Sequence, residues 1–321
     1  MMINQPDTLL TVAEPPHVHN GRTFKGMTLE TFVALLPAAV MATWHFGMPA
    51  VRVMALACAV SVITEAICWR VVKRESQVDD YTAALSGLFF AFLLPASAPW
   101  WLVAMGAVVT ITIGKMIFGG NGGNPLGAAL VGWASCRISW GGYMDAYTTM
   151  LDTPLRAPLH ELKFFGLEAV SDIPLKSMML GDQLGGLGAA QTGAVLIGGL
   201  YLIFRRIARP EIPFGYLLGV AGAALIFQWA YPGEQASPLF HILGGGTMFG
   251  AFFLATDPAP SPVTPVPMLL FGLLGGILTM LIRVYGVYPD AVPFALILAQ
   301  LATPLLDRIA PKPFGARRPA A

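Results

Sequence analysis

A succession of long apolar segments constrains this chain more than any other feature. Its 321 residues are 55% hydrophobic and only 12% charged, whereas soluble domains carry about 25% charged residues. A helix that crosses a bilayer needs about 20 mostly apolar residues. Ten segments approach this requirement, namely 29–47, 49–71, 82–98, 100–118, 125–140, 188–204, 213–231, 239–256, 268–282 and 289–306. We therefore expect an all-α integral membrane protein with about ten transmembrane helices, some of them broken by glycine and proline.

The distribution of lysine and arginine predicts how these spans are oriented. Ten spans put both termini on one side, which then carries thirteen of the nineteen Lys and Arg residues. Because cytoplasmic loops are enriched in basic residues, both termini are predicted to be cytoplasmic. The expected organisation is a cytoplasmic segment (1–26), five spans (27–140), an outer loop (141–187), five more spans (188–308) and a cytoplasmic tail (309–321). No cleavable signal peptide is expected, since no basic start precedes an apolar stretch in the first segment.

Two segments suggest an internal repeat. Residues 87–95 read GLFFAFLLP and residues 250–258 read GAFFLATDP, so Gly, Phe, Phe and Pro recur in register. They lie five spans apart and so cross the membrane in opposite directions. This pattern predicts two inverted five-helix repeats with a site between the halves. The alternative is a chance match, because Gly, Phe and Pro are common in membrane spans.

Several classes of function are excluded by composition. The formal net charge of +1 gives no reason to expect nucleic acid as a partner. The three cysteines contain no CxxC pair, so we expect neither a disulfide framework nor a metal site in this chain. No motif combines Ser, His and Asp or Cys and His for nucleophilic catalysis.

A glycine-rich stretch between the fourth and fifth spans is a candidate ligand site. Residues 119–125 read GGNGGNP and follow Lys115 within the fourth span. Gly119 and Gly120 leave the backbone free to approach a flat or anionic ligand, while Asn121 and Asn124 offer hydrogen-bond donors and acceptors. A tight helical hairpin that merely requires glycine is the alternative interpretation.

Two acidic residues in spans are functional candidates, because ionisable groups are costly in a bilayer. Glu65 precedes Arg70 in the second span, and Asp257 ends the eighth span before a proline-rich stretch. Either could contact an ion path, and Asp257 could also orient a cofactor. The alternatives are an ion pair between Glu65 and Arg70 near the membrane surface, and a helix-ending turn at Asp257.

With these residues considered together, the chain resembles the D subunit of the Rnf ion-pumping electron-transport complex. More distantly, it resembles the B subunit of sodium-translocating NADH:quinone reductase. The resemblance covers nearly the whole chain. It rests on PHV at residues 16–18, the GG and NP of 119–125, ATDP at 255–258 with SPVT at 261–264, and IRVYG at 282–286 leading to Tyr288 and Pro289.

The resemblance implies that the chain carries flavin. Its members attach FMN through the phosphate to a threonine on the outer side, and a second, non-covalent riboflavin is expected. Thr153 before Pro154 matches the family's attachment threonine, with Asp152 in the place of alanine. The spacing from Asp145 departs from the family motif by two residues, so Thr148 and Thr149 remain alternatives. Residues 185–192 (GGLGAAQT) also depart from the family pattern, which leaves the riboflavin site open.

The implied function is that of a membrane subunit in an Rnf-type ferredoxin:NAD oxidoreductase complex of the bacterial inner membrane. This membrane component would relay electrons through flavin, coupled to translocation of Na⁺ or H⁺, and would not be catalytic alone. The resemblance implies partner subunits with iron–sulfur clusters, FMN and the NADH site, a flavin transferase, and the lipid bilayer. Two alternatives stay open: a channel or carrier for a small polar solute with inverted repeats, and a structural subunit without flavin.

Overall fold

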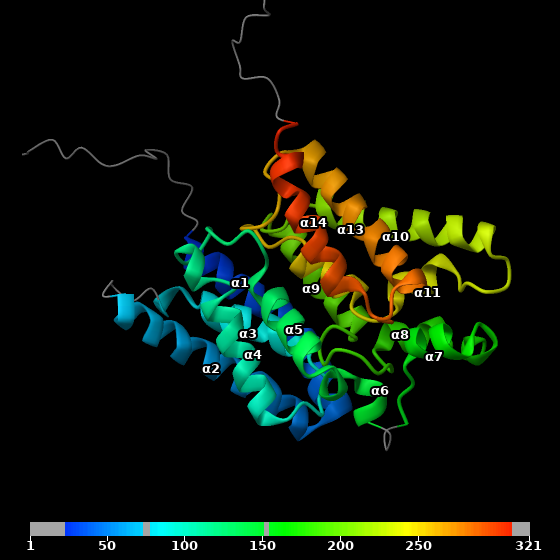
Figure 1. Ribbon diagram of the computed structural model, residues 1–321, viewed down its shortest axis with the longest axis horizontal. Helices are drawn as coiled ribbons and strands as arrows, with labels where there is room; N and C mark the ends of the chain where they lie inside the picture. Colours follow the sequence, from blue (N-terminus) through cyan, green and yellow to red (C-terminus); the bar gives the residue numbers. More distant parts are fainter. Residues whose placement is uncertain (1–22, 73–77, 151–153, 310–321) are drawn as a thin grey trace, which may run out of the picture.

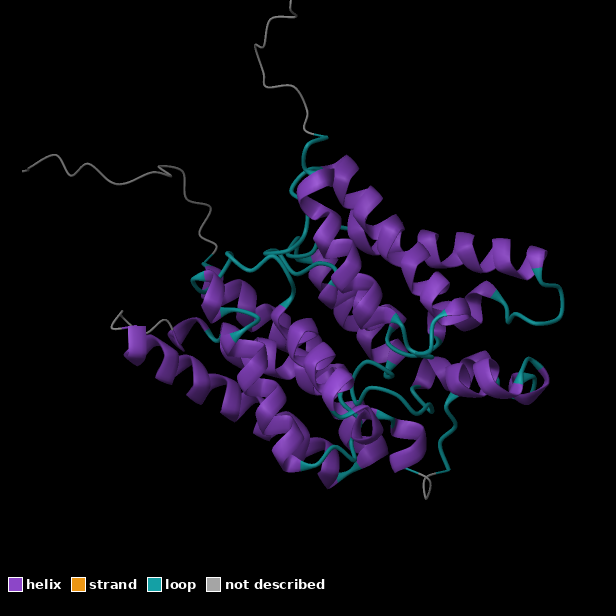
Figure 2. Ribbon diagram, viewed as in Figure 1, coloured by secondary structure: helices purple, strands orange, loops and turns teal. Residues whose placement is uncertain are grey.

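The chain is all-helical over the part that the computed structural model describes, residues 23–72, 78–150 and 154–309 (Figure 2). In these residues the only β pairing is an isolated bridge between Arg156 and Gln183. Five segments are long and apolar enough to cross a membrane: α1 (Phe24–Phe46), α2 (Met48–Val72), Trp100–Phe118, α10 (Glu211–Ala230) and α13 (Pro265–Tyr285). Shorter apolar helices are α3 (Thr82–Leu93), α9 (Thr192–Phe204) and α14 (Val292–Leu306). The protein is therefore a multi-pass membrane protein.

The first half of the chain packs around α2. This helix contacts α3 and α4 (Trp100–Thr112), and α4 in turn contacts α5 (Ala128–Ser139). The short turns η1 (Val78–Asp80) and η2 (Met116–Phe118) flank α3 and α4. Helix α5 begins at Ala128 rather than at the predicted Pro125, because the glycine-rich stretch continues as a loop up to Gly127.

The second half packs in a corresponding way around α10, which contacts α13 and α11 (Pro238–Leu243), while α13 contacts α14. Four glycines let α10 and α13 approach each other closely. A Cβ atom added at Gly219 would lie 2.5 Å from the Leu273 carbonyl oxygen, and one at Gly276 would lie 2.2 Å from that of Tyr216. Small residues at the contact between two helices are typical of helix packing within membranes. Contacts of α1 with α9 and of α5 with α14 join the two halves.

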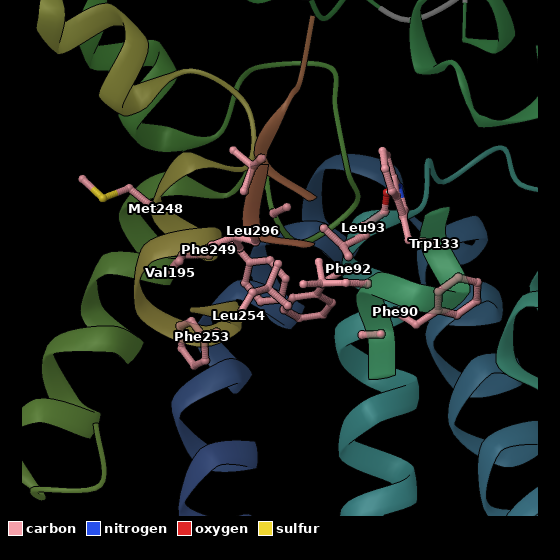
Figure 3. Packing of buried hydrophobic residues seen from close by; sticks show 14 of the residues in the cluster. Phe90, Phe92, Leu93, Trp133, Val195, Met248, Phe249, Phe253, Leu254 and Leu296 are labelled. Carbon is pink, nitrogen blue, oxygen red and sulfur yellow. The ribbon is translucent and has the colours of Figure 1, made fainter. Parts of the chain in front are cut away.

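The third and eighth predicted spans are interrupted at the centre of the molecule. Helix α3 ends at Leu93, two residues before Pro95, as is usual before a proline. The eighth span is divided into α11, α12 (Thr247–Phe249) and the π-helical turn η5 (Gly250–Leu254). Figure 3 shows side chains of these broken elements facing each other, with Phe92 of α3 near Phe249 and Leu254. The ring centres of Phe92 and Phe249 are 5.6 Å apart.

The long loop of the chain folds into short helices at one end of the molecule (Figure 1). These are η3 (Gly141–Met144), α6 (Ala146–Thr149), α7 (Pro158–Phe165), η4 (Glu168–Val170) and α8 (Leu175–Leu180). A separate apolar cluster anchors α7 and α8 to α11, through Leu159, Met178 and Phe240 among others. We call this end the loop face, and the opposite end, where α1 starts and α14 ends, the terminal face.

Candidate functional site

A cavity of about 820 Å³ lies between the two halves near the terminal face. Residues from α1, α3, the loop after α4, α9 and the segment after η5 line it. Four of the predicted site residues meet there, although they come from distant parts of the chain: Lys115, Asn121, Asn124 and Asp257. Apolar side chains, including Phe89 and Phe253, complete the wall.

Lys115 and Glu65 form a buried ion pair beside this cavity. Lys115 Nζ lies 2.7 Å from Glu65 Oε1 and also donates to Thr82 Oγ1 at 2.7 Å. Glu65 is 0% exposed, and its Oε1 accepts a further hydrogen bond from Trp69 Nε1 at 3.3 Å. The alternative pairing of Glu65 with Arg70 is wrong, because Arg70 points to the exposed side of α2 and Lys115 occupies the position next to the carboxylate.

The hydrogen bonds continue from the buried pair to the rim of the cavity. Thr82 Oγ1 donates to Asp80 Oδ1 at 2.6 Å, and Asn121 Nδ2 donates to Asp80 Oδ2. Lys115 is 3% exposed, whereas Asn121 is exposed at the rim. This network links a fully buried carboxylate to a solvent-exposed amide, so it fixes the polar side of the cavity.

The glycine-rich stretch positions the two asparagines. Gly119 and Gly120 have φ angles of 97° and 103°, which residues with a Cβ atom rarely adopt. They form the turn after η2 and do not line the cavity, whereas Gly122 does. Asn124 is buried, and its Nδ2 donates to the Leu126 carbonyl at 2.8 Å. The two glycines therefore shape the turn, and the two asparagines reach the cavity wall.

Asp257 lines the same cavity from the other half of the chain. It follows η5, and its Oδ1 lies 3.5 Å from the backbone N of Ala259, which is the geometry of a helix-ending turn. Among the described residues, the charged side chains of the cavity wall are three carboxylates (Asp79, Asp80 and Asp257) and two lysines (Lys25 and Lys115). The formal charge of these five side chains is slightly negative, which disfavours a strongly anionic occupant.

The predicted attachment residues Asp152 and Thr153 lie outside the described residues. The alternative threonines are described, and both lie on α6. Their hydroxyl groups donate to the Asp145 carbonyl, and Thr149 Oγ1 also lies 2.7 Å from Ser97 Oγ. The Asp145 side chain caps α6 by accepting from the backbone N of Tyr147.

An aromatic pair stands beside this segment. The ring of His160 on α7 stacks on Tyr147, with a centroid separation of 3.9 Å. Both rings line a small cavity of about 100 Å³ that also includes Asp145 and Arg137. Burial lowers the pKa of His160 below its ordinary value of 6.5, although Asp145 and Glu161 raise it in part.

Sequence reasoning missed several residues of the terminal-face cavity. Asp80 and Thr82 were not singled out, yet they connect Lys115 to Asn121. The signal was available, because an Asp side chain often accepts a hydrogen bond from the backbone N–H two residues on, as Asp80 does from Thr82 at 3.0 Å. Phe89 and Phe253 belong to the repeated segments, but only the fold shows that both face the same cavity.

Comparisons with known proteins agree on one family. A family model described as "NQR2, RnfD, RnfE family" matches residues 11–315. The chain is 37% identical over 302 residues to the D subunit of the Na(+)-translocating ferredoxin:NAD(+) oxidoreductase complex of Acetobacterium woodii, and the match covers 93% of each chain. It is 33% identical over 349 residues to the D subunit of the ion-translocating oxidoreductase complex of Yersinia enterocolitica, covering 96% of this chain and 99% of that relative.

Proposed function

This chain belongs to the NQR2, RnfD, RnfE family, and on that premise we propose that it is the membrane-embedded D subunit of an Rnf-type ferredoxin:NAD oxidoreductase complex. In this proposal the protein relays electrons through bound flavin and couples them to translocation of Na⁺ or H⁺. It resides in the bacterial inner membrane, with the terminal face in the cytoplasm. The iron–sulfur clusters, the NADH site and further FMN belong to partner subunits.

The terminal-face cavity is the observation that carries the flavin proposal. Ligand pockets in proteins measure about 300–1,000 Å³, and this cavity, at about 820 Å³, lies within that range. The edge of a flavin ring alternates hydrogen-bond donors and acceptors, which the amides of Asn121 and Asn124 complement. Phe89 and Phe253 provide apolar surface for the flat faces of a ring.

The charge of the cavity favours a flavin without phosphate. Among the described residues of its wall, three carboxylates face two lysines, and this set of charges would repel a phosphate dianion. Riboflavin is uncharged and avoids this cost. When bound, such a cofactor supplies the electron transfer, while the protein positions it, excludes water and adjusts its potential through nearby charges. Lys115, held by Glu65 and Thr82, places its ammonium group at the cavity wall, with the Glu65 carboxylate directly behind it.

We place the covalent FMN at the loop face, on Thr153. Support comes from the match of Thr153 and Pro154 to the family motif. The hydroxyl groups of Thr148 and Thr149 already bond the Asp145 carbonyl, which makes them weaker candidates. A flavin transferase would attach the group. Two flavins at opposite faces would let electrons cross the insulating layer in steps.

The proposed architecture is ten spans in two inverted five-helix halves. The pairing of helices around α2 resembles that around α10, and the broken α3 corresponds to the broken α11, α12 and η5. Inverted repeats of this kind place a site between the halves, where the terminal-face cavity lies. Glu65 and Asp257 are proposed to contact the ion path, since one is buried beside this cavity and the other lines it.

The cavity assignment is tested by the flavin content of the purified complex. Asn124→Leu and Asn121→Leu remove one amide each from the ligand space. Gln228→Leu removes an exposed amide from α10, away from the cavity, and serves as the matched control. Flavin released by denaturation is quantified by chromatography. We expect both asparagine variants to lose non-covalent flavin and Gln228→Leu to retain it.

The covalent assignment is tested on the same preparations by in-gel fluorescence after denaturation. Thr153→Val should abolish the fluorescent band, while Thr148→Val and Thr149→Val should keep it. If the band is lost in Thr148→Val or Thr149→Val but kept in Thr153→Val, the attachment site is the threonine whose substitution removes the band. A chain that carries neither flavin in a host with an active transferase would favour the carrier or the structural-subunit interpretation.

A further inference from the structure

A basic cavity of about 330 Å³ lies at the loop face, separate from the sites above. Its basic side is formed by Lys163 of α7, His241 of α11 and Arg283 of α13, and Leu159 and Leu162 contribute apolar surface. We call it the basic cavity. Figure 1 shows α7 and α11 close together at this end of the molecule, and their shared apolar cluster fixes their contact.

His241 is the first observation that points to a ligand. The residue is 2% exposed, and neither ring nitrogen has a hydrogen-bond partner among residues 23–72, 78–150 and 154–309. The Nε atom of buried Arg283 is likewise unpartnered within this part of the chain. Buried polar groups are nearly always hydrogen-bonded, so unpaired donors lining a cavity indicate an occupant that accepts hydrogen bonds.

The charges around the cavity favour an anion. Arg283 donates to the His241 and Gly244 carbonyls at 2.6 Å and 3.0 Å, and Asp290 lies 3.7 Å from its guanidinium group. Lys163 Nζ, in contrast, donates to the carbonyls of Arg283 and Gly286. In the described residues no carboxylate oxygen lies within 4.0 Å of this ammonium group.

Within the described part of the chain, Glu234 is the only acidic residue of the cavity wall. It is exposed, and solvent screens its charge. Lys163 therefore contributes a positive charge that no buried carboxylate balances. An occupant with a single negative charge and several acceptor oxygens would complement both this charge and the unpaired donors.

The helix ends beside the cavity carry exposed aromatic residues of the kind found at the headgroup layer of a bilayer. At the same ends of α10 and α13, Trp229 is 87% and Tyr285 is 66% exposed. The ring of Tyr285 contacts that of Phe227, with centroids 5.7 Å apart, which holds the two helix ends together. Exposed Trp and Tyr residues mark the interface between the acyl chains and water. Lysine and arginine side chains at this level can bind a phosphate headgroup through charge-assisted hydrogen bonds.

We propose that the basic cavity binds a phosphate group through Lys163, His241 and Arg283, carried by an anionic phospholipid headgroup or free in solution. Phosphate oxygens accept hydrogen bonds from all three side chains. The apolar part of the wall, with Leu159 and Leu162, would contact the glycerol and acyl carbons of a lipid. The inference does not depend on flavin at either face.

The test uses the full-length chain, purified with its membrane complex and delipidated in detergent. Native mass spectrometry counts phosphatidylglycerol bound per chain during a titration, and thermal unfolding in sodium phosphate tests the free anion. Lys163→Met removes the unbalanced charge. Lys176→Met removes an exposed lysine of α8 and is the matched control. Charge-assisted hydrogen bonds predict about 10- to 100-fold weaker binding in Lys163→Met and no change in Lys176→Met.

A second variant covers the case in which Lys163→Met does not fold. His241→Leu removes two nitrogens that bond no described residue, so it should leave the fold intact and still weaken binding. Phosphatidylglycerol bound without any effect of phosphate identifies a lipid. If phosphate stabilises the wild type but neither variant, and displaces phosphatidylglycerol, the ligand is the free anion. Equal binding by the wild type, Lys163→Met and His241→Leu would overturn the proposal.

Discussion

Removal of the Lys115 charge alone is predicted to destabilise the protein strongly, because its partner Glu65 is fully buried. Lys115 Nζ lies 2.7 Å from Glu65 Oε1, and both side chains are almost completely shielded from solvent. Their Coulomb attraction is about 6 kcal/mol with an effective dielectric constant of about 20. Desolvation offsets much of this, yet breaking one side of a buried pair typically costs about 3–5 kcal/mol. We expect Lys115→Met to lower the free energy of unfolding by that amount.

A double-mutant cycle separates this effect from lost packing. Glu65→Gln combined with Lys115→Met removes both charges and should recover much of the stability, since neutral replacement of a buried pair is often tolerated. Equilibrium unfolding in mixed micelles compares the four proteins, and a coupling energy of about 2–3 kcal/mol is expected. Arg205→Met breaks the exposed pair with Glu30 and should cause no measurable loss. Single-variant losses that simply add in the double variant would refute the reasoning.

The remaining predictions concern packing and pH. Gly276→Leu should lower the free energy of unfolding by about 1–3 kcal/mol or more, because its Cβ would lie 2.2 Å from a backbone oxygen of α10. Gly222→Leu should leave the free energy of unfolding unchanged, because a Cβ atom at this position meets open space. Thermal unfolding compares the two variants. Burial lowers the pKa of His160, so the unfolded chain takes up its proton first as the pH falls. Thermal stability should therefore decline below about pH 6.5, and His160→Gln should flatten that part of the profile.

The helical class followed directly from the sequence, whereas span lengths did not. Apolar stretches near residues 49–71 and 268–282 became full-length helices, because nothing in them interrupts the backbone hydrogen bonds. The predicted spans 82–98 and 239–256 became shorter or broken, since Pro95 and three consecutive glycines at 244–246 end their helices. Glycine and proline content predicted such breaks, but the new helix ends depend on tertiary contacts.

The residues of the candidate site could be predicted from the sequence, but the contacts between them could not. Lys115, Asn121, Asn124 and Asp257 were identified from residue type and position, and the structure brings them to one cavity. Glu65 was identified as well, but its partner lies fifty residues away on a neighbouring element. Residues five apart on a helix do not share a face, so Arg70 could not reach it. The basic cavity could not be predicted from the sequence, because Lys163, His241 and Arg283 lie far apart in the chain and meet only where α7, α11 and α13 come together.

We propose above all that this chain holds a flavin at each face of the membrane. The most direct test of this proposal is intact mass measurement of the chain, purified with its complex from a host with an active flavin transferase, together with analysis of the flavin released on denaturation. The account predicts a polypeptide heavier by one covalently attached FMN, and riboflavin without phosphate in the released fraction. An unmodified polypeptide and a released fraction without flavin would contradict it.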